Sequence, residues 1–186
     1  MAKYHLGQKG LKKLYEYPKM WDKPEKLIIS PSYITNGYII FARTAVKGSS
    51  NIFTEDDSFS AMKVQELLKN PVQEITDDSV HGALGLNGDL LGLHAYDRTS
   101  IIIDGKSCKV DLWKDNNGLM LFNYDVLDYF KIKLSRGYAT SNNGCLFDSE
   151  LGKGFSLAIM PLSVSNLGAF VSEYSGDIKT LAQCLD

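Results

Sequence analysis

The sequence predicts an α+β domain with mostly antiparallel sheets and two main helices, and three observations support this prediction. Short runs of strand-forming residues are joined by turn signals, of which Asn36-Gly37 and Asp104-Gly105 are the clearest. Helical spacing of apolar residues is confined to short segments. The last strong apolar run, Phe155–Met160, ends at Pro161, which cannot donate to a sheet ladder.

The first elements are a helix and two strand segments. Residues 7–17 carry apolar side chains three and four positions apart, with lysines on the other face, which predicts a short amphipathic helix. The apolar positions are Leu11, Leu14 and Tyr15. Pro18 ends or redirects this helix. Strands are expected at 27–29 and 33–44, the second interrupted by the Asn36-Gly37 turn.

Residues 47–92 are interpreted as an acidic insertion in this single domain. A helix is predicted from about Phe59 to Leu68, and it stops before Pro71. Residues 76–92 hold four glycines and show no regular period, so we expect a loop there.

After the insertion the pattern returns to strands and a second main helix. A clear hairpin is predicted over 99–113. A strand at 119–122 is followed by Asn123, a residue type that caps helices, and by a short apolar helix. A further hairpin is expected over 138–147, and residues 162–186 form a C-terminal extension behind the closing strand.

Length and composition indicate one soluble domain over residues 1–186. The chain is 44% hydrophobic and 23% charged, with a net charge of −2. Its apolar runs are too short for a membrane-spanning helix. The N-terminus shows no secretory signal, and three widely spaced cysteines suit a reducing compartment, so a cytoplasmic location is expected.

The basic N-terminal segment is the strongest candidate for binding. Residues 1–43 carry eight Lys or Arg and three Asp or Glu side chains. Lysines can neutralise phosphates while aromatic rings stack or pack beside them, which predicts a surface for DNA, including duplex DNA. The candidate DNA-binding residues are Lys9, Lys12, Lys13, Lys19, Trp21, Lys23 and Lys26. A solvated lysine-rich helix face above a core of aromatic residues explains the same pattern.

An acidic segment offers a second candidate surface. Residues 51–82 carry seven Asp or Glu side chains and two lysines. A carboxylate-rich surface can occupy the basic DNA channel of another protein through complementary potential. The candidate partner-binding residues are Glu55, Asp56, Asp57, Asp77 and Asp78. The alternative interpretation is an acidic loop that is simply solvated.

The chain carries no motif that indicates catalysis. Gly105-Lys106-Ser107 matches the end of a phosphate-binding loop, but Ser100 stands where that motif needs glycine. The three histidines lack metal-ligand spacing to one another or to cysteine. We therefore expect a non-enzymatic protein with no catalytic residues, no metal and no cofactor. A Cys–His nucleophile assembled in space remains the enzymatic alternative.

Several segments together resemble one domain of a DNA sliding clamp of the bacterial polymerase III β-clamp type. Thr35-Asn36-Gly37 is similar to the turn that closes an early hairpin in that family. The strand Phe155–Met160 running into Pro161 is similar to the strand that closes the domain. Helices near residues 11–15 and 126–130 complete the resemblance. A clamp subunit joins several such domains, whereas this chain has room for one. Residues 162–186 also follow the Met-Pro that lies almost at the C-terminus in the family, so the family's peptide pocket is not carried over.

The resemblance implies a protein of a phage or another mobile element that has kept the clamp-like domain. Such a protein docks on DNA, or on a DNA-processing protein such as a nuclease or polymerase, with no membrane involved. Assembly of several copies into a ring would need complementary edges. The alternative is an inhibitor of a host DNA-targeting defence nuclease, of the anti-CRISPR type, that blocks the nuclease's DNA channel.

Overall fold

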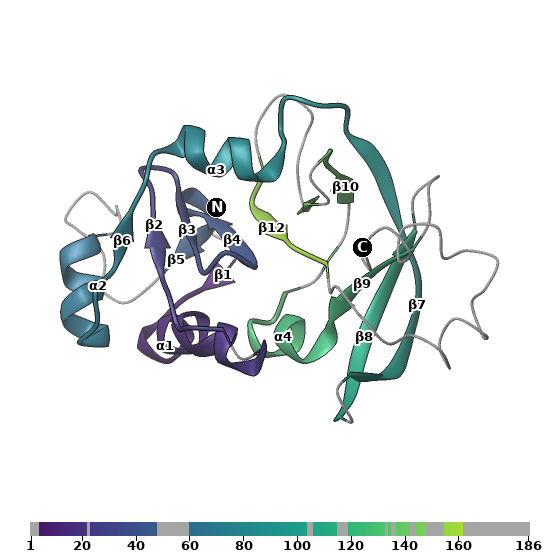
Figure 1. Cartoon of the computed structure of the whole chain (residues 1–186), viewed down its shortest axis with the longest axis horizontal. Helices are drawn as coiled ribbons and strands as arrows, with labels where there is room; N and C mark the ends of the chain where they lie inside the picture. Colours follow the sequence, from purple (N-terminus) through teal and green to yellow (C-terminus); the bar gives the residue numbers. More distant parts are fainter. Residues whose placement is uncertain are drawn as a thin grey trace.

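The computed structural model describes residues 4–21, 23–47, 60–103, 106–114, 119–132, 134, 137–141, 144–147 and 155–161 (Figure 1). These residues form four α-helices and a ten-stranded, mostly antiparallel sheet, so the predicted α+β class is confirmed. In the same residues, no helix is both long and apolar enough to cross a membrane.

The elements follow one another closely along the chain. The helices are α1 (Gln8–Glu16), α2 (Ala61–Leu68), α3 (Asp77–Leu84) and α4 (Tyr124–Tyr129), with the 3-10 helices η1 (Tyr17–Trp21) and η2 (Arg43–Ala45). The strands before α4 are β1 (Tyr4–His5), β2 (Ile28–Ile29), β3 (Tyr33–Thr35), β4 (Ile39–Ala42), β5 (Val46–Lys47), β6 (Gln73–Glu74), β7 (Leu91–Ile103), β8 (Lys106–Lys114) and β9 (Leu119–Asn123). The strands after α4 are β10 (Gly137–Ala139), β11 (Cys145–Phe147) and β12 (Leu157–Ile159). The large sheet has the order β6-β2-β3-β4-β12-β11-β10-β7-β8-β9, and β1 pairs separately with β5.

A β–α–β–β–β order of elements occurs twice in this chain. The first set is β1, α1, β2, β3 and β4, and the second is β9, α4, β10, β11 and β12. In the sheet, β2-β3-β4 is followed by β12-β11-β10, so the last strands of the two sets pair at the centre. Ile40 of β4 lies opposite Ala158 of β12 in this antiparallel pair. The two sets therefore have an approximate two-fold arrangement about that contact, although the sequence shows no visible repeat.

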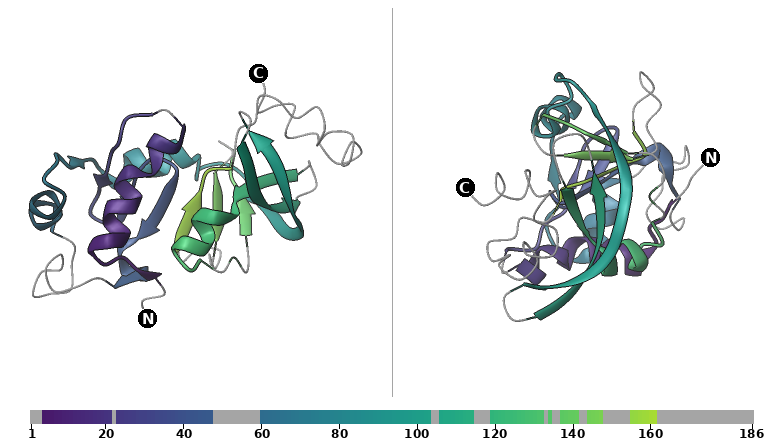
Figure 2. Two further views of the ribbon diagram at one scale, coloured as in Figure 1. Left: turned by 90° about the horizontal axis from the view of Figure 1, so that it is seen from below. Right: turned by 90° about the vertical axis from the view of Figure 1, so that its right-hand side faces the viewer.

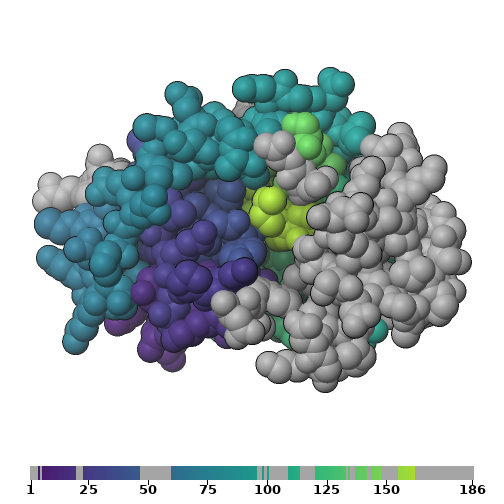
Figure 3. Space-filling model, in the orientation of Figure 1, coloured from purple at the N-terminus to yellow at the C-terminus, as the bar shows by residue number. Residues whose placement is uncertain are grey.

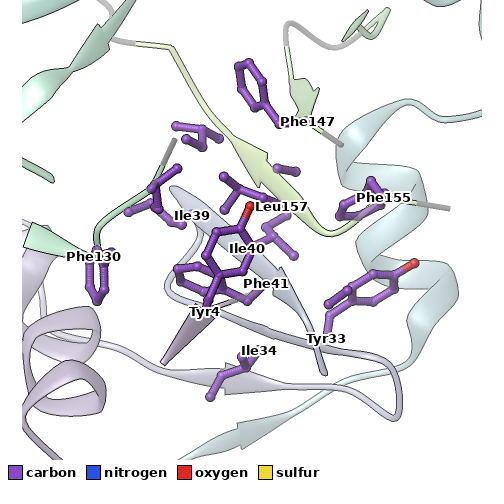
Figure 4. Close-up of a cluster of buried hydrophobic side chains, with 14 of the residues drawn as sticks. Tyr4, Tyr33, Ile34, Ile39, Ile40, Phe41, Phe130, Phe147, Phe155 and Leu157 are labelled. Carbon is purple, nitrogen blue, oxygen red and sulfur yellow. The ribbon is translucent and has the colours of Figure 1, made fainter. Parts of the chain in front are cut away.

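The hydrophobic core is built around the central pair of strands (Figure 4). All four residues of β4 are buried, and the Phe41 ring packs edge-on against Tyr4 and against Phe130, the residue that follows α4. Tyr33 of β3 stacks on Phe155, with ring centroids 5.1 Å apart. Side chains from both sets of elements thus share one core.

The hairpin between β3 and β4 turns at Asn36-Gly37, as the sequence predicts. Gly37 has a φ of +90°. Asn36 stabilises the turn through its side chain. Its Oδ1 accepts hydrogen bonds from the N–H groups of Tyr38 and Ile39, both at 2.9 Å, and its Nδ2 donates to the Leu14 carbonyl at 2.9 Å. Asn36 is fully buried. The turn therefore also fastens α1 to the sheet.

The expectation of a loop over residues 76–92 is wrong at both ends, because residues 77–84 form α3 and β7 begins at Leu91. The Thr76 hydroxyl accepts the N–H of Ser79 at 3.3 Å and caps the helix. Val80 and Leu84 face the core, four residues apart. A helix this short has two apolar core positions, which are too few to establish a helical period in the sequence. The glycines in and after this segment also favour the interpretation as a loop.

The segment between the two sets supplies the flanks of the sheet. β6 pairs in parallel with β2 at one edge, and β7 pairs with β10 before it continues into the long hairpin with β8. In Figure 3 α3 and the chain leading into it, in teal, lie along the upper side of the N-terminal segment, in purple. The Asp104-Gly105 turn and the extension 162–186 lie outside the described residues.

Candidate nucleic-acid interface

The basic N-terminal segment is organised by α1. Leu11 and Leu14 are fully buried and fix the inner side of the helix against the core. The positions opposite them hold Lys9, Lys12 and Lys13, because residues three and four apart share a helix face. Figure 2 (left) shows α1 in front of the strands it packs on, with α4 beside it. The lysines of α1 therefore lie on the outer side of this layer.

Further lysines follow the C-terminal end of α1. Lys23 and Lys26 are exposed, and the Lys26 N–H donates to the Tyr15 carbonyl at 3.2 Å, which holds the chain beside the helix. Lys19 forms an ion pair with Glu25, and this hydrogen-bonded carboxylate raises the pKa of the Lys19 ammonium. The side chain of Trp21 lies outside the described residues, although its backbone is the last residue of η1.

We call Lys9, Lys12, Lys13, Lys23 and Lys26 the basic strip. Among the described side chains, the acidic groups nearest to it in sequence are Glu16 and Glu25. Glu16 lies 3.8 Å from the Lys12 ammonium on the exposed side of α1, where water weakens such a pair. Cations around the last turn of α1 also suit the negative end of the helix dipole. The strip therefore keeps a positive balance.

Tyr129 of α4 joins the strip from the neighbouring helix. Its hydroxyl donates to the Lys9 carbonyl at 3.4 Å, and the Lys13 ammonium lies 5.0 Å from the centre of its ring. That distance is within the range of a cation–π contact. Tyr129 is not among the binding residues predicted from the sequence, because the apolar side of this helix carried that prediction. The available signal was an aromatic residue placed outside the apolar stripe.

The outer side of α4 bounds the strip with negative charge. Asp125 and Asp128 are exposed, and Asp128 pairs with Lys131 at 3.2 Å. The Asp125 carboxylate would repel a phosphate, whereas Lys131 offsets the charge of Asp128. The positive charge of the basic strip therefore lies along α1 and ends where α4 begins.

The predicted acidic partner surface is only partly within the described residues. Glu55, Asp56 and Asp57 lie outside them. Asp77 and Asp78 stand in the first turn of α3, where negative charge favours a helix. Asp78 is exposed, whereas the Asp77 carboxylate accepts the N–H of Ser32 at 3.0 Å. Asp77 is thus engaged in joining α3 to the β2–β3 turn.

The pKa of Asp77 follows from these contacts. Partial burial on its own would raise the pKa of the carboxyl group. Hydrogen bonds from Ser30 and Ser32 and the nearby His81 outweigh that effect, and the net pKa lies below its ordinary value. Asp77 is therefore held as a carboxylate in the folded protein.

A concave region that was not predicted from the sequence lies between α4 and the β7–β8 hairpin. The cavity has a volume of about 610 Å³. Arg98 pairs with Asp111 at 2.5 Å on its wall, and its guanidinium lies 3.9 Å from the Tyr124 ring centre. The charges that line it are balanced in pairs, Arg98 with Asp111 and Lys131 with Asp128. This cavity is therefore a weaker candidate for a charged ligand than the basic strip.

Two residues that bear on the enzymatic alternative, Cys145 and His81, have described contacts within the fold. Cys145 is buried, and its Sγ lies 3.1 Å from the Met120 sulfur. His81 instead shares a 2.9 Å hydrogen bond with the Tyr33 hydroxyl. Within the described ranges, no three His, Cys, Asp or Glu side chains gather to hold a metal ion. The side chain of Cys108 and the whole of Cys184 lie outside those ranges.

No family model, no curated protein and no solved structure matches this chain.

Proposed function

We propose that this chain is a non-enzymatic binding protein that docks on DNA through the basic strip on α1. The observation that carries the proposal is the anchoring of α1. Leu11 and Leu14 are buried, and the Leu14 carbonyl is held by Asn36, so the helix presents its lysines from a fixed support. A rigid row of lysines can neutralise successive phosphates and release their counterions.

The arrangement of the two helices supports a clamp-like architecture. α1 and α4 occupy equivalent positions in the two β–α–β–β–β sets, and they touch through Tyr129 and the Lys9 carbonyl. A clamp-like protein of this kind would hold a DNA-processing partner, such as a polymerase or nuclease, on its DNA. This assignment rests on analogy of architecture.

The alternative role, an inhibitor that blocks the DNA channel of a defence nuclease, stays a prediction. Three of its candidate residues, Glu55, Asp56 and Asp57, lie outside the described residues. Asp77 is occupied within the fold, which leaves Asp78 as the exposed member of the described pair.

The proposal is tested by equilibrium binding to labelled DNA over a range of salt concentrations. We expect affinity to fall steeply with salt, because phosphate contacts release counterions. Lys12→Glu/Lys13→Glu should weaken binding and lower the slope of log K against log salt by about 2, roughly one for each phosphate contact. The measurement is fluorescence anisotropy of a labelled oligonucleotide.

A matched single reversal separates a local effect from a general loss of positive charge. Lys12→Glu is compared with Lys109→Glu, because Lys109 is exposed on β8. In Figure 2 (left) the hairpin of β7 and β8, in teal, lies apart from α1, in purple. The first variant should weaken binding more than the second. Equal losses of DNA affinity in Lys12→Glu and Lys109→Glu would exclude the basic strip as the binding surface. Unchanged DNA affinity in Lys12→Glu/Lys13→Glu would exclude it as well.

A further inference from the structure

Tyr129 combines unusual exposure with a basic setting. Among the described residues the exposed large apolar side chains are Met62, Leu91 and Tyr129, so Tyr129 is the aromatic one. Its side chain is 43% exposed, although its neighbours Val126 and Phe130 are buried. An aromatic ring left in water beside lysines is typical of surfaces that stack nucleic-acid bases.

The ring is held in place at the junction of two helices. It packs edge-to-face with Phe130, with centroids 5.1 Å apart and planes at 82°. Its hydroxyl reaches the Lys9 carbonyl, and the Lys13 ammonium covers part of the ring at 5.0 Å. Buried side chains fix the backbones of both helices. The ring therefore loses little conformational entropy when a ligand binds.

The charges around the Tyr129 ring favour a single strand over a duplex as the ligand. Lys9 and Lys13 lie on the α1 side of Tyr129, whereas Asp125 and Asp128 are exposed on the outer side of α4. A duplex that lies across both helices would place a phosphate over Asp125, which would repel it, beside the Asp128–Lys131 ion pair. A single strand can follow α1 alone and keep its phosphates on the lysines.

We propose that the basic strip binds single-stranded nucleic acid, with one base stacked on Tyr129 and the flanking phosphates on Lys9 and Lys13. This inference rests on the proposed function, because it uses the same lysines. Stacking on an exposed ring requires an unpaired base, since duplex bases already stack on one another and hide their faces. Recognition through a π-face and a phosphate backbone tolerates any base sequence.

The test compares a labelled 20-nucleotide oligo-dT with a 20-base-pair duplex at the same salt concentration. We expect the full-length protein to bind the single strand more tightly. Tyr129→Ala should weaken single-strand binding roughly tenfold, the loss typical of one stacked base. Tyr129→Phe keeps the ring and loses only the hydroxyl, so its affinity should stay within about twofold of the native protein.

Two further variants keep the result interpretable. Tyr129→Leu preserves an apolar side chain without a π-face, and it should bind as weakly as Tyr129→Ala even if the alanine variant is less stable. Met62→Ala removes another exposed apolar side chain, on α2, and should bind like the native protein. Thermal unfolding of each variant checks that the fold is retained.

The outcomes distinguish this inference from the proposed function. The stacking role is overturned if the duplex binds more tightly than the single strand. It is also overturned if Tyr129→Ala and Tyr129→Leu bind the single strand with native affinity. In either case, weaker binding by Lys12→Glu/Lys13→Glu would still support the proposed DNA binding. Binding to neither oligonucleotide would overturn both proposals. Single-strand preference that depends on the ring supports both.

Discussion

Asp77 connects two parts of the fold through one side chain. Its carboxylate accepts the Ser32 N–H at the β2–β3 turn while its backbone starts α3. Burial opposes the charged form, but hydrogen bonds from Ser30 and Ser32 and the proximity of His81 lower the pKa of the carboxyl group. A group whose pKa is lowered in the folded state adds stability above its ordinary pKa, and that contribution is lost as pH falls through the lowered value.

Asp77→Asn should therefore change how stability depends on pH. The variant is expected to lose stability at neutral pH and to show a flatter dependence below about pH 4, the ordinary range of Asp titration. The measurement is the free energy of unfolding from denaturant titrations across the acidic range. Asp78→Asn is the comparison, because Asp78 is exposed in the same first turn of α3 and both variants remove one negative charge from it. Asp77→Asn should change the dependence more, since it also loses the bond to Ser32. Parallel curves for native protein and Asp77→Asn would show that Asp77 carries no such linkage.

Single residues also mark what the sequence could and could not predict. The Asn36-Gly37 turn was predictable because that dipeptide favours tight turns. The hydrogen bond from Asn36 to Leu14 was not, because it joins residues from different elements through the tertiary fold. Tyr129 was invisible as a binding residue for the same reason, since its lysine neighbours come from α1.

At the scale of elements, β10 depends on a close approach at Gly137. A Cβ added there would lie 2.9 Å from Cε1 of Phe147 and 3.2 Å from Cβ of Leu93. β10 lies between β7 and β11, so its backbone has little room to move aside. Glycine is required at this point by packing.

Gly137→Ala should accordingly lower the free energy of unfolding by about 1–3 kcal/mol, the usual cost of overpacking. Gly92→Ala is its matched control, because Gly92 is a strand glycine on β7 where an added Cβ meets nothing within 4 Å. That variant should be neutral or more stable by up to about 1 kcal/mol, since alanine reduces the freedom of the unfolded chain. Denaturant unfolding measures both. Equal stability of the two variants would contradict the packing argument.

The elements themselves were predicted as well as their local signals allowed. Asn123 was expected to cap the second main helix, and its Oδ1 accepts the Val126 N–H at 3.3 Å in α4. By contrast, α3 was hidden by its short length and its glycines. The pairing of β4 with β12 could not be read from either strand alone, because both are uniformly apolar and have many compatible neighbours.

On the scale of the whole molecule, one core and one sheet join the two sets of elements. We therefore expect a single cooperative unfolding transition. In a Trp21→Phe background, fluorescence reports on Trp113, which is buried against Phe147. Far-UV circular dichroism reports on all helices. The two signals should give the same denaturant midpoint, and separated midpoints would mean that the two sets unfold independently.

The central pairing has a consequence for how the protein is made on the ribosome. β4 is complete at residue 42, but its partner β12 ends at residue 159. The β4 edge that pairs with β12 therefore stays unpaired while more than half of the chain is synthesised. At bacterial and eukaryotic elongation rates this interval is roughly 6–25 s. Throughout it, the nascent chain presents an apolar strand edge of the kind that promotes aggregation. Shielding of that edge by a chaperone during synthesis should therefore raise the yield of folded protein.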